Sequence, residues 1–246
     1  MSLFNTRIKK KQTQSFSAQR RNILNNKTSF YVRESYNSLR TNVRFFQAGQ
    51  NCKRFCVTSA VAGEGKSITI LNMAIAFAED GQRVLLIDAD MRRPSQGRLL
   101  IECASPGLSN LLADQCDVQE VIRENVYPNM DVIFSGDIPP NPSELLGSPR
   151  MEELIEQLSK NYDYILVDSP PAGIVTDACL IGKVLDGAVF LVRQNKTQKD
   201  ILARSVKQLE NAGVRMMGFV INGYIANSNH IHRQEYRAEE TRKKLF

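Results

Sequence analysis

Several features are scarce in this chain of 246 residues, and each scarcity argues against a class of protein. No apolar run reaches the roughly 18 residues that are needed to cross a bilayer, and the first residues hold no hydrophobic signal segment. The five cysteines include no C-x-x-C pair, which argues against a disulfide framework and predicts reduced thiols. The sequence therefore predicts a cytoplasmic protein that reaches a membrane only if a partner carries it there.

Histidine is also rare, with two residues in the chain, so a transition-metal site would have few ligands. Cys52 and Cys56 lie in the first quarter of the sequence, whereas His230 and His232 lie near its end. Because the two pairs are far apart in sequence, we do not expect them to form a metal site. The hydrophobic content of 42% is enough to bury one large core, as in a single α/β domain of ordinary size.

Acidic residues are absent from residues 1–30, where seven Lys and Arg residues occur. Since the whole chain carries a formal charge of +6, the remainder is close to neutral. A segment this polar cannot bury enough apolar surface to fold alone, so we expect a mobile basic arm over residues 1–30. An anionic membrane surface or an acidic partner segment would attract such an arm, and a plain solvated tail fits equally well. Its aromatic residues are few, so no nucleic acid is expected as a partner.

The most informative segment runs from Phe55 to Ser67, where an apolar run breaks into glycines and an apolar helix follows. Glycines let successive backbone N–H groups point at phosphate oxygens, and the N-terminus of the following helix favours the same anion. The pattern matches G-x-x-x-x-G-K-[ST] except that Ala60 replaces the first glycine. The expected nucleotide contacts are Ala62, Gly63, Glu64, Gly65, Lys66, Ser67 and Ile68. Lys66 would reach the β and γ phosphates and the Ser67 hydroxyl would ligate Mg²⁺, although a glycine-rich turn with a solvated lysine would look similar.

Acidic residues follow two further apolar runs. The run 83–88 ends in Asp88 and is followed closely by Asp90, and the run 162–168 ends in Asp168. In an open parallel sheet the ligand lies beyond the carboxyl ends of the strands, so these acids and the glycine-rich loop converge on one crevice. Asp88 and Asp168 are therefore candidate metal ligands together with Ser67. A single aspartate in such a position is more often a turn or helix cap, but three in this order favour a Mg-nucleotide site.

Periodicity along the rest of the chain predicts strands that alternate with helices. We expect helices over 32–47, 107–114, 117–124, 176–184 and 198–211 and one that begins at Pro149, strands over 130–134, 188–192 and 217–221, and a proline-rich loop over 136–142. Such an order predicts an α/β fold of the P-loop NTPase type, with a mostly parallel sheet covered by helices on both faces. We expect this domain over residues 31–222 and a C-terminal tail over 223–246.

The order AGEGKS, LLIDADMRRP and ILVDSPP resembles the bacterial tyrosine kinase family over roughly Val32 to Asn222. The discriminating motif is the middle one, which has the form D-x-D-x-R. Relatives that partition chromosomes or place the division site carry a lysine five residues before their P-loop lysine, where this chain has Val61. Those relatives also continue their acidic motif as D-x-D-P-Q, whereas Met91 and Arg92 follow Asp90 here.

The resemblance implies transfer of the γ-phosphoryl group of ATP to a tyrosine hydroxyl, with Mg²⁺ as cofactor. Asp88 is then the candidate proton acceptor, with Asp90 orienting metal or substrate. Arg92 would steady the acidic loop, which is the segment from Asp88 to Arg93, or the transition state. A structural ion pair is an equal alternative for this residue. Asn222 is expected to hydrogen-bond the adenine, as its counterpart does in related P-loop ATPases, and a turn asparagine would look much the same.

The resemblance also implies partners. Family members join into rings through an E-x-x-R-x-x-R motif, which reads Glu34, Asn37 and Arg40 here, and phosphorylate tyrosines in their C-terminal tails, where Tyr236 and Tyr224 are the candidates. A separate transmembrane polysaccharide co-polymerase would activate the kinase, in control of capsule or exopolysaccharide synthesis. Two other classes remain open, a MinD- or ParA-like ATPase switch and a non-catalytic nucleotide-binding scaffold.

Overall fold

The computed structural model describes residues 17–46 and 53–224. Within these residues a sheet has the strand order β3-β4-β2-β5-β1-β6-β7, in which every neighbouring pair is parallel except the antiparallel pair of β3 and β4. The strands are β1 (Lys53–Ser59), β2 (Val84–Asp88), β3 (Ile122–Tyr127), β4 (Met130–Ile133), β5 (Tyr164–Asp168), β6 (Gly187–Arg193) and β7 (Met216–Asn222). The predicted α/β fold with a mostly parallel sheet is confirmed.

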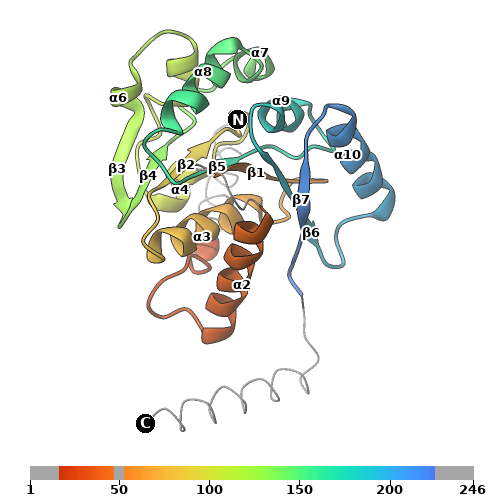
Figure 1. Cartoon of the computed structure of the whole chain (residues 1–246). Coiled ribbons are helices and arrows are strands. Elements are labelled where there is room, and N and C mark those ends of the chain that lie inside the picture. The colour runs from red at the N-terminus through yellow and green to blue at the C-terminus, as the bar shows by residue number, and fades with distance from the viewer. Residues whose placement is uncertain (1–16, 47–52, 225–246) are drawn as a thin grey trace, which may run out of the picture.

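Helices cover both faces of the sheet (Figure 1). The helices are α2 (Phe30–Phe46), α3 (Lys66–Glu79), α4 (Gln96–Leu100), α5 (Leu108–Leu112), α6 (Val118–Val121), α7 (Pro142–Leu146), α8 (Pro149–Leu158), α9 (Asp177–Lys183) and α10 (Lys199–Asn211). Figure 1 shows α2 beside α3 on one face, and α8, α9 and α10 on the other. The sheet is therefore the middle layer of three, as parallel sheets require because both of their faces are apolar.

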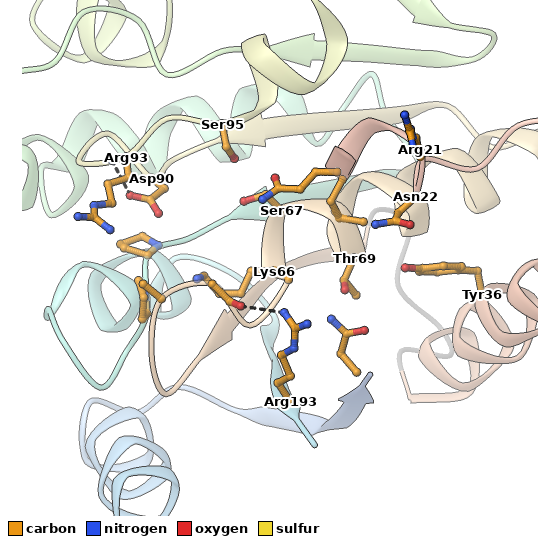
Figure 2. A pocket seen from close by; sticks show the side chains of 18 of the residues that line it. Arg21, Asn22, Tyr36, Lys66, Ser67, Thr69, Asp90, Arg93, Ser95 and Arg193 are labelled. Atoms are coloured by element: carbon orange, nitrogen blue, oxygen red, sulfur yellow. Dashed lines mark hydrogen bonds between the residues drawn. The ribbon is translucent and has the colours of Figure 1, made fainter. Parts of the chain in front are cut away.

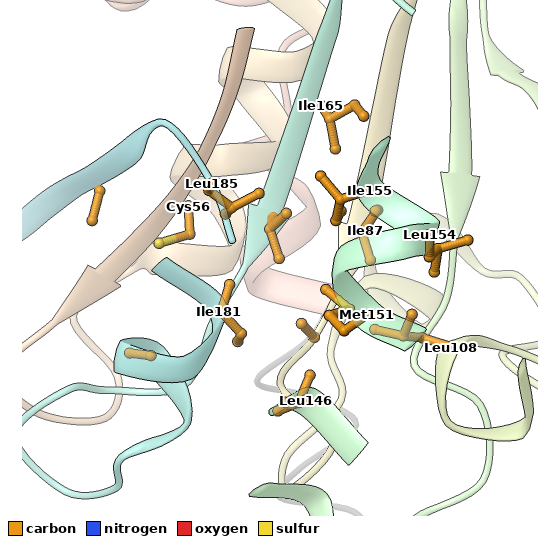
Figure 3. Close-up of a cluster of buried hydrophobic side chains, with 14 of the residues drawn as sticks. Cys56, Ile87, Leu108, Leu146, Met151, Leu154, Ile155, Ile165, Ile181 and Leu185 are labelled. Carbon is orange, nitrogen blue, oxygen red and sulfur yellow. The ribbon is translucent and has the colours of Figure 1, made fainter. Parts of the chain in front are cut away.

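Alternation along the central strands divides the buried side chains between two clusters. In β2, Leu85 and Ile87 belong to the cluster beneath α8 and α9, whereas Val84 and Leu86 belong to the cluster beneath α2 and α3. The period of two follows from strand geometry, which sends successive side chains to opposite faces. Figure 3 shows part of the first cluster, where Met151 and Ile155 of α8 pack near Ile87. Burial on both faces fixes the strand register and with it the positions of the residues that follow each strand.

Helix α2 packs on its own domain through the apolar stripe that its sequence predicts. Val43 is 5% exposed, and Tyr36 and Leu39 pack against the cluster beneath α3. The Arg40 guanidinium donates a hydrogen bond of 2.7 Å to the carbonyl oxygen of Ala76 in α3. The last arginine of the expected subunit-contact motif therefore serves a contact within the chain.

Residues 17–29 also pack on the domain, so the described fold begins before the boundary expected at residue 31. Leu24 is 2% exposed, and its backbone N–H donates a hydrogen bond of 2.9 Å to Oδ1 of Asn72 in α3. The Asn72 amide in turn donates to the carbonyl oxygen of Asn22. The prediction of a mobile arm over residues 1–30 does not hold for residues 17–29, because the buried Leu24 and the hydrogen bonds to Asn72 anchor this segment on α3.

The segment after Asp117 differs from the expected helix over 117–124. Helix α6 ends at Val121, and Ile122–Tyr127 forms the edge strand β3. The backbone N–H of Asp117 donates to the Glu120 carboxylate, which supports the first turn only. Pairing with β4 then takes the chain into the sheet, with a register shift between Arg123 and Tyr127 that no local pattern encodes. The short helices α4 and α7 were likewise not predicted.

No helix within residues 17–46 and 53–224 combines the length and apolar character that a bilayer crossing needs.

Candidate functional site

The loop between β1 and α3 has the backbone that a phosphate cradle needs. Gly63 and Gly65 have φ angles of +74° and +106°, a region that side chains other than glycine rarely enter. Helix α3 starts directly at Lys66 and runs for 14 residues, so its free N–H groups and positive dipole end face the loop. Lys66 is 6% exposed, and burial lowers the pKa of its ammonium, an effect that Asp168, Asp90 and Glu64 oppose.

Two residues of the loop that follows β6, together with Glu64 of the phosphate loop itself, hold the phosphate loop in place. The Glu64 carboxylate, which is fully buried, accepts hydrogen bonds from the backbone N–H of Val61 and from the Thr197 hydroxyl. The Lys196 ammonium lies 2.9 Å from the carbonyl oxygens of Ala62 and Gly63. These contacts fix the loop conformation before any ligand arrives, which lowers the cost of binding.

Asp88 ends β2 and is fully buried. One of its carboxylate oxygens accepts the backbone N–H groups of Ser95 and Gln96, at 3.1 and 3.0 Å, and the other accepts that of Asp90 at 3.3 Å. Burial and the neighbouring Asp168 raise the pKa of Asp88 well above its usual range. With both oxygens occupied by backbone groups, Asp88 organises the acidic loop, and this geometry does not favour the expected role as proton acceptor.

Asp90 is the acid of this loop that reaches the cavity. It is 9% exposed and lines the same cavity as Lys66, and its Oδ1 accepts the backbone N–H of Arg93 at 3.0 Å (Figure 2). Burial raises the pKa of Asp90, while the Arg93 backbone N–H and the Lys66 ammonium lower it. A carboxylate with a raised pKa at the wall of a cavity is suited to accept a proton.

Asp168 ends β5 and pairs in register with Asp88 of β2, so the two carboxylates are neighbours across the sheet. Its Oδ2 accepts a hydrogen bond of 2.8 Å from the Gln96 side-chain amide, and its Oδ1 has no hydrogen-bond partner. Burial raises the pKa of Asp168 to about 6, an effect that the Ser67 hydroxyl and the Lys66 ammonium oppose. An unpartnered buried carboxylate oxygen beside a P-loop serine is a donor set that fits Mg²⁺, which prefers oxygen ligands.

Arg92 makes an ion pair and not a contact within the acidic loop. Its guanidinium donates to both carboxylate oxygens of Asp177, at 2.8 and 3.1 Å, and to the Ser143 hydroxyl at 2.8 Å. The Asp177 side chain is fully buried at the start of α9. Arg92 therefore connects the acidic loop to α9 and α7. The structure thus contains the ion pair that was the alternative expectation for this residue.

A cavity of about 1040 Å³ opens over these groups. Figure 2 shows Lys66, Ser67 and Asp90 on one part of its wall, with Arg21 and Tyr36 farther along. Its lining includes Ala62, Gly63, Gly65, Lys66, Ser67, Ile68, Asp90, Arg92 and Asn222. Of the remaining expected site residues, Glu64, Asp88 and Asp168 lie behind this wall, where they hold the loop and the acids in place.

The two candidate acceptor tyrosines fall at the end of the described chain or beyond it. Tyr224 is 68% exposed just after β7. Tyr236 lies outside the described residues, as do Cys52, His230 and His232. Asn222 lines the cavity, but its amide Nδ2 donates to the carbonyl oxygen of Glu64 at 2.7 Å.

Sequence reasoning missed three residues of this site. Gln96 contacts Asp168 and the Ser67 carbonyl oxygen, Thr197 contacts Glu64, and Asp177 pairs with Arg92. Gln96 and Asp177 carry no local signal. Thr197 follows the end of β6, and a polar residue after a parallel strand is the signal that would have identified it.

Comparisons with known proteins agree with this geometry. A family model described as an AAA domain matches residues 53–184, which is more than half of the chain. The tyrosine-protein kinase YwqD of Bacillus subtilis is 37% identical over 190 residues, which cover 77% of this chain and 80% of YwqD. The solved structure of the kinase domain of the Escherichia coli tyrosine kinase Etk aligns with a TM-score of 0.77 and 33% identity, over 80% of this chain and 77% of that chain.

A more distant structure separates fold from family. The septum site-determining protein MinD of Pyrococcus horikoshii, in complex with Mg-ADP, aligns with a TM-score of 0.62 and 21% identity, over 72% of each chain. At that identity the likeness concerns the P-loop fold alone. Identity above 30% over four-fifths of a curated kinase, together with a second acidic loop beside the P-loop, shows that this chain belongs to the bacterial tyrosine kinase family.

Proposed function

We propose that this chain is an ATP-dependent protein-tyrosine kinase that transfers the γ-phosphoryl group of ATP to tyrosine hydroxyls. The observation that carries the proposal is the position of Asp90, which stands at the wall of the cavity that Lys66 and Ser67 also line. A P-loop alone supports hydrolysis or switching equally well. A second acid facing the same cavity gives a protein hydroxyl a place to lose its proton.

The phosphates of ATP would lie against the N-terminus of α3 and the loop before it. Lys66 would neutralise negative charge on the β and γ phosphates, and the backbone N–H groups around Gly63 and Gly65 would donate to their oxygens. Arg193 and Lys196 add positive charge around this loop, where both donate to the Gly63 carbonyl oxygen. Positive charge on this side favours binding of the triphosphate and steadies the charge that moves to the leaving oxygen.

Asp90 would accept the proton of the tyrosine hydroxyl. A phenol with a pKa of about 10 is a weak nucleophile at neutral pH, so its proton must move to a base as the new P–O bond forms. Asp88 would keep the Asp90 loop in place through its three backbone contacts. Arg92 would do the same from the other side through Asp177.

Ser67 and Asp168 are the residues that would hold Mg²⁺, directly or through water. The unpartnered Oδ1 of Asp168 and the Ser67 hydroxyl supply oxygen donors that fit this ion. When bound, Mg²⁺ neutralises phosphate charge and orients the γ phosphate. Holding the ion is therefore the proposed task of these two side chains, whereas Asp88, on the neighbouring strand, has both carboxylate oxygens occupied by backbone N–H groups.

The biological setting follows from the family. We expect the kinase in the cytoplasm, where a separate transmembrane polysaccharide co-polymerase would bring it to the membrane and activate it during capsule or exopolysaccharide synthesis. Tyr224 and Tyr236 remain the acceptor candidates within the tail over 223–246. Exposed aromatic side chains on α2, with Phe45 78% exposed and Phe30 54% exposed, support homo-oligomer formation through this helix.

The test is phosphotyrosine formation by the purified full chain with Mg-ATP and a synthetic glutamate–tyrosine copolymer as substrate. We expect label on tyrosine in the unaltered chain and its loss in Lys66→Met, Asp90→Asn and Asp168→Asn. Lys183→Met is the matched control, because Lys183 is exposed at the end of α9, and it should retain activity. Replacing Tyr224 and Tyr236 by Phe should reduce self-labelling while the copolymer is still phosphorylated.

The same assay distinguishes the alternatives. Release of free phosphate without phosphotyrosine would favour an ATPase switch of the MinD or ParA kind. Nucleotide binding without either product would favour a non-catalytic scaffold. Activity that survives Lys66→Met would contradict the proposed site itself.

A further inference from the structure

Unpartnered buried oxygen atoms gather next to the P-loop serine. Within residues 17–46 and 53–224, four buried side-chain polar atoms have no hydrogen-bond partner, and three of them are Ser95 Oγ, Gln96 Oε1 and Asp168 Oδ1. Leaving a buried acceptor without a donor destabilises the fold, so a folded chain rarely tolerates several such atoms. Their concentration indicates a place where a ligand supplies what the protein does not.

Gln96 connects all three motifs of the site through one side chain. Its amide Nε2 donates to Asp168 Oδ2 at 2.8 Å and to the Ser67 carbonyl oxygen at 3.1 Å. Its backbone N–H donates to Asp88 at 3.0 Å. The residue is fully buried, so these contacts are shielded from solvent and hold their geometry.

The orientation of the Gln96 amide is fixed by its neighbours. Both acceptors on one side, the Asp168 carboxylate and the Ser67 carbonyl oxygen, require the NH₂ group there. The oxygen Oε1 must then face the other way, where it has no partner. The Gln96 amide nitrogen thus holds one oxygen of the Asp168 carboxylate, and the other oxygen of that carboxylate, Oδ1, is left without a partner.

We propose that Gln96 is a positioning residue for the magnesium site, which holds Asp168 with its amide nitrogen and so keeps the unpartnered Oδ1 of Asp168 available to Mg²⁺ or to its bound water. This inference rests on the proposed function, since it requires a Mg-nucleotide in the cavity. Mg²⁺ keeps several of its waters when it binds to proteins, and those waters are donors only. Oriented acceptors around a metal site commonly strengthen binding of the metal without touching it.

The experiment measures binding of the fluorescent nucleotide mant-ADP to the full chain, first in EDTA and then at increasing Mg²⁺. In Gln96→Met, which keeps the size of the side chain and removes both hydrogen-bonding ends, the mant-ADP Kd in EDTA should stay within about twofold of the unaltered chain. The Mg²⁺ concentration at half-maximal tightening should rise roughly tenfold or more. Gln119→Met in α6 is the matched control and should change neither value, because Gln119 is exposed.

Gln96→Asn provides a second variant in case the methionine variant does not fold. The shorter amide keeps its polarity but retracts by one bond, about 1.5 Å, so it should weaken the Mg²⁺ effect in the same direction. Mg²⁺ dependence that matches the unaltered chain in both variants would overturn the role of Gln96. An equal loss of metal-free and metal-bound affinity would overturn it too, since that pattern indicates general support of the fold. Absence of any Mg²⁺ effect in the unaltered chain would instead overturn the proposed function.

Discussion

The Asn222 side chain reaches from the end of β7 to the P-loop, where its Nδ2 donates a hydrogen bond of 2.7 Å to the carbonyl oxygen of Glu64. Its Oδ1 accepts the backbone N–H of Gly223, so both ends of the amide contact backbone. The amide packs directly over Gly65, where an added Cβ would lie 2.3 Å from Nδ2. The strand edge and the phosphate loop are therefore coupled through this asparagine.

Substitution of Gly65 by alanine should abolish tight nucleotide binding. The new methyl group meets the Asn222 amide, and the φ angle of +106° is strained for any residue with a Cβ. We expect a loss of at least about tenfold in mant-ADP affinity, equivalent to about 1.4 kcal/mol. Gly81→Ala is the control, because Gly81 also has a positive φ, of +79°, but nothing lies within 4 Å of its Cβ position. The control should lose stability and keep its affinity, and equal affinities in both variants would contradict the coupling.

Thr197 should influence nucleotide affinity although it does not line the cavity. In Thr197→Val the buried Glu64 carboxylate loses the hydroxyl donor and keeps only the backbone N–H of Val61. A lost hydrogen bond to a buried charged group costs about 1–3 kcal/mol, part of which we expect as weaker binding. Mant-ADP affinity should fall several-fold by fluorescence titration, while Thr41→Val on the exposed part of α2 should leave it unchanged. Unaltered affinity in Thr197→Val would show that nucleotide binding does not depend on the hydrogen bond between Thr197 and Glu64.

Substitution of Arg92 should lower the free energy of unfolding and should not act directly on phosphoryl transfer. Arg92→Ala leaves the fully buried Asp177 carboxylate with the Ser143 hydroxyl donor at 2.7 Å but without its cation. Because the arginine side chain is 40% exposed, water screens part of the pair, and we expect a loss of about 1–2 kcal/mol in the free energy of unfolding. Denaturant unfolding measures this, with Arg93→Ala as a control of small effect. Loss of kinase activity with unchanged stability would instead assign Arg92 to the transition state.

The stability of the fold should depend on pH through the titration of Asp168. Its pKa of about 6 lies above its ordinary value of 3.8, so the folded protein binds this proton more tightly than the unfolded chain. The resulting stabilisation is complete below pH 4 and is lost as the pH rises to about 6. Asp168→Asn, measured without nucleotide in EDTA, should therefore have a higher Tm than the unaltered chain at pH 7, by roughly 2–4 °C for each kcal/mol, with the difference shrinking toward pH 4.

Asp163 offers the opposite control for that measurement. A hydrogen bond from Arg83 lowers the pKa of Asp163, so this carboxylate stabilises the fold when ionised. Asp163→Asn should lower the Tm at pH 7 and converge with the unaltered chain as the pH falls. A Tm for Asp168→Asn that is lower than that of the unaltered chain at every pH would contradict the assigned burial cost.

Local sequence signals were enough to locate most of the site. Glycine at positions 63 and 65 permits the two positive φ angles, and Ser148 with Pro149 begins α8 as expected. Gly81 ends α3 with a φ of +79°. These features depend on one residue and its immediate neighbours, so they can be predicted from the sequence of that segment alone. The edge strand β3 was missed because pairing with β4 decides its conformation and its own residues lack a clear alternation.

By itself, the sequence determined the strand ends, the phosphate loop and the three acids that follow buried strands. The tertiary structure decided what each acid does, because β2 lies beside β5 and sets Asp88 against Asp168. The same packing brings Gln96 to partners 29 and 72 residues away and turns Asp88 toward backbone N–H groups, leaving Asp90 at the cavity. Hydrogen-bond partners at such separations are selected by strand order and burial, which no stretch of neighbouring residues contains.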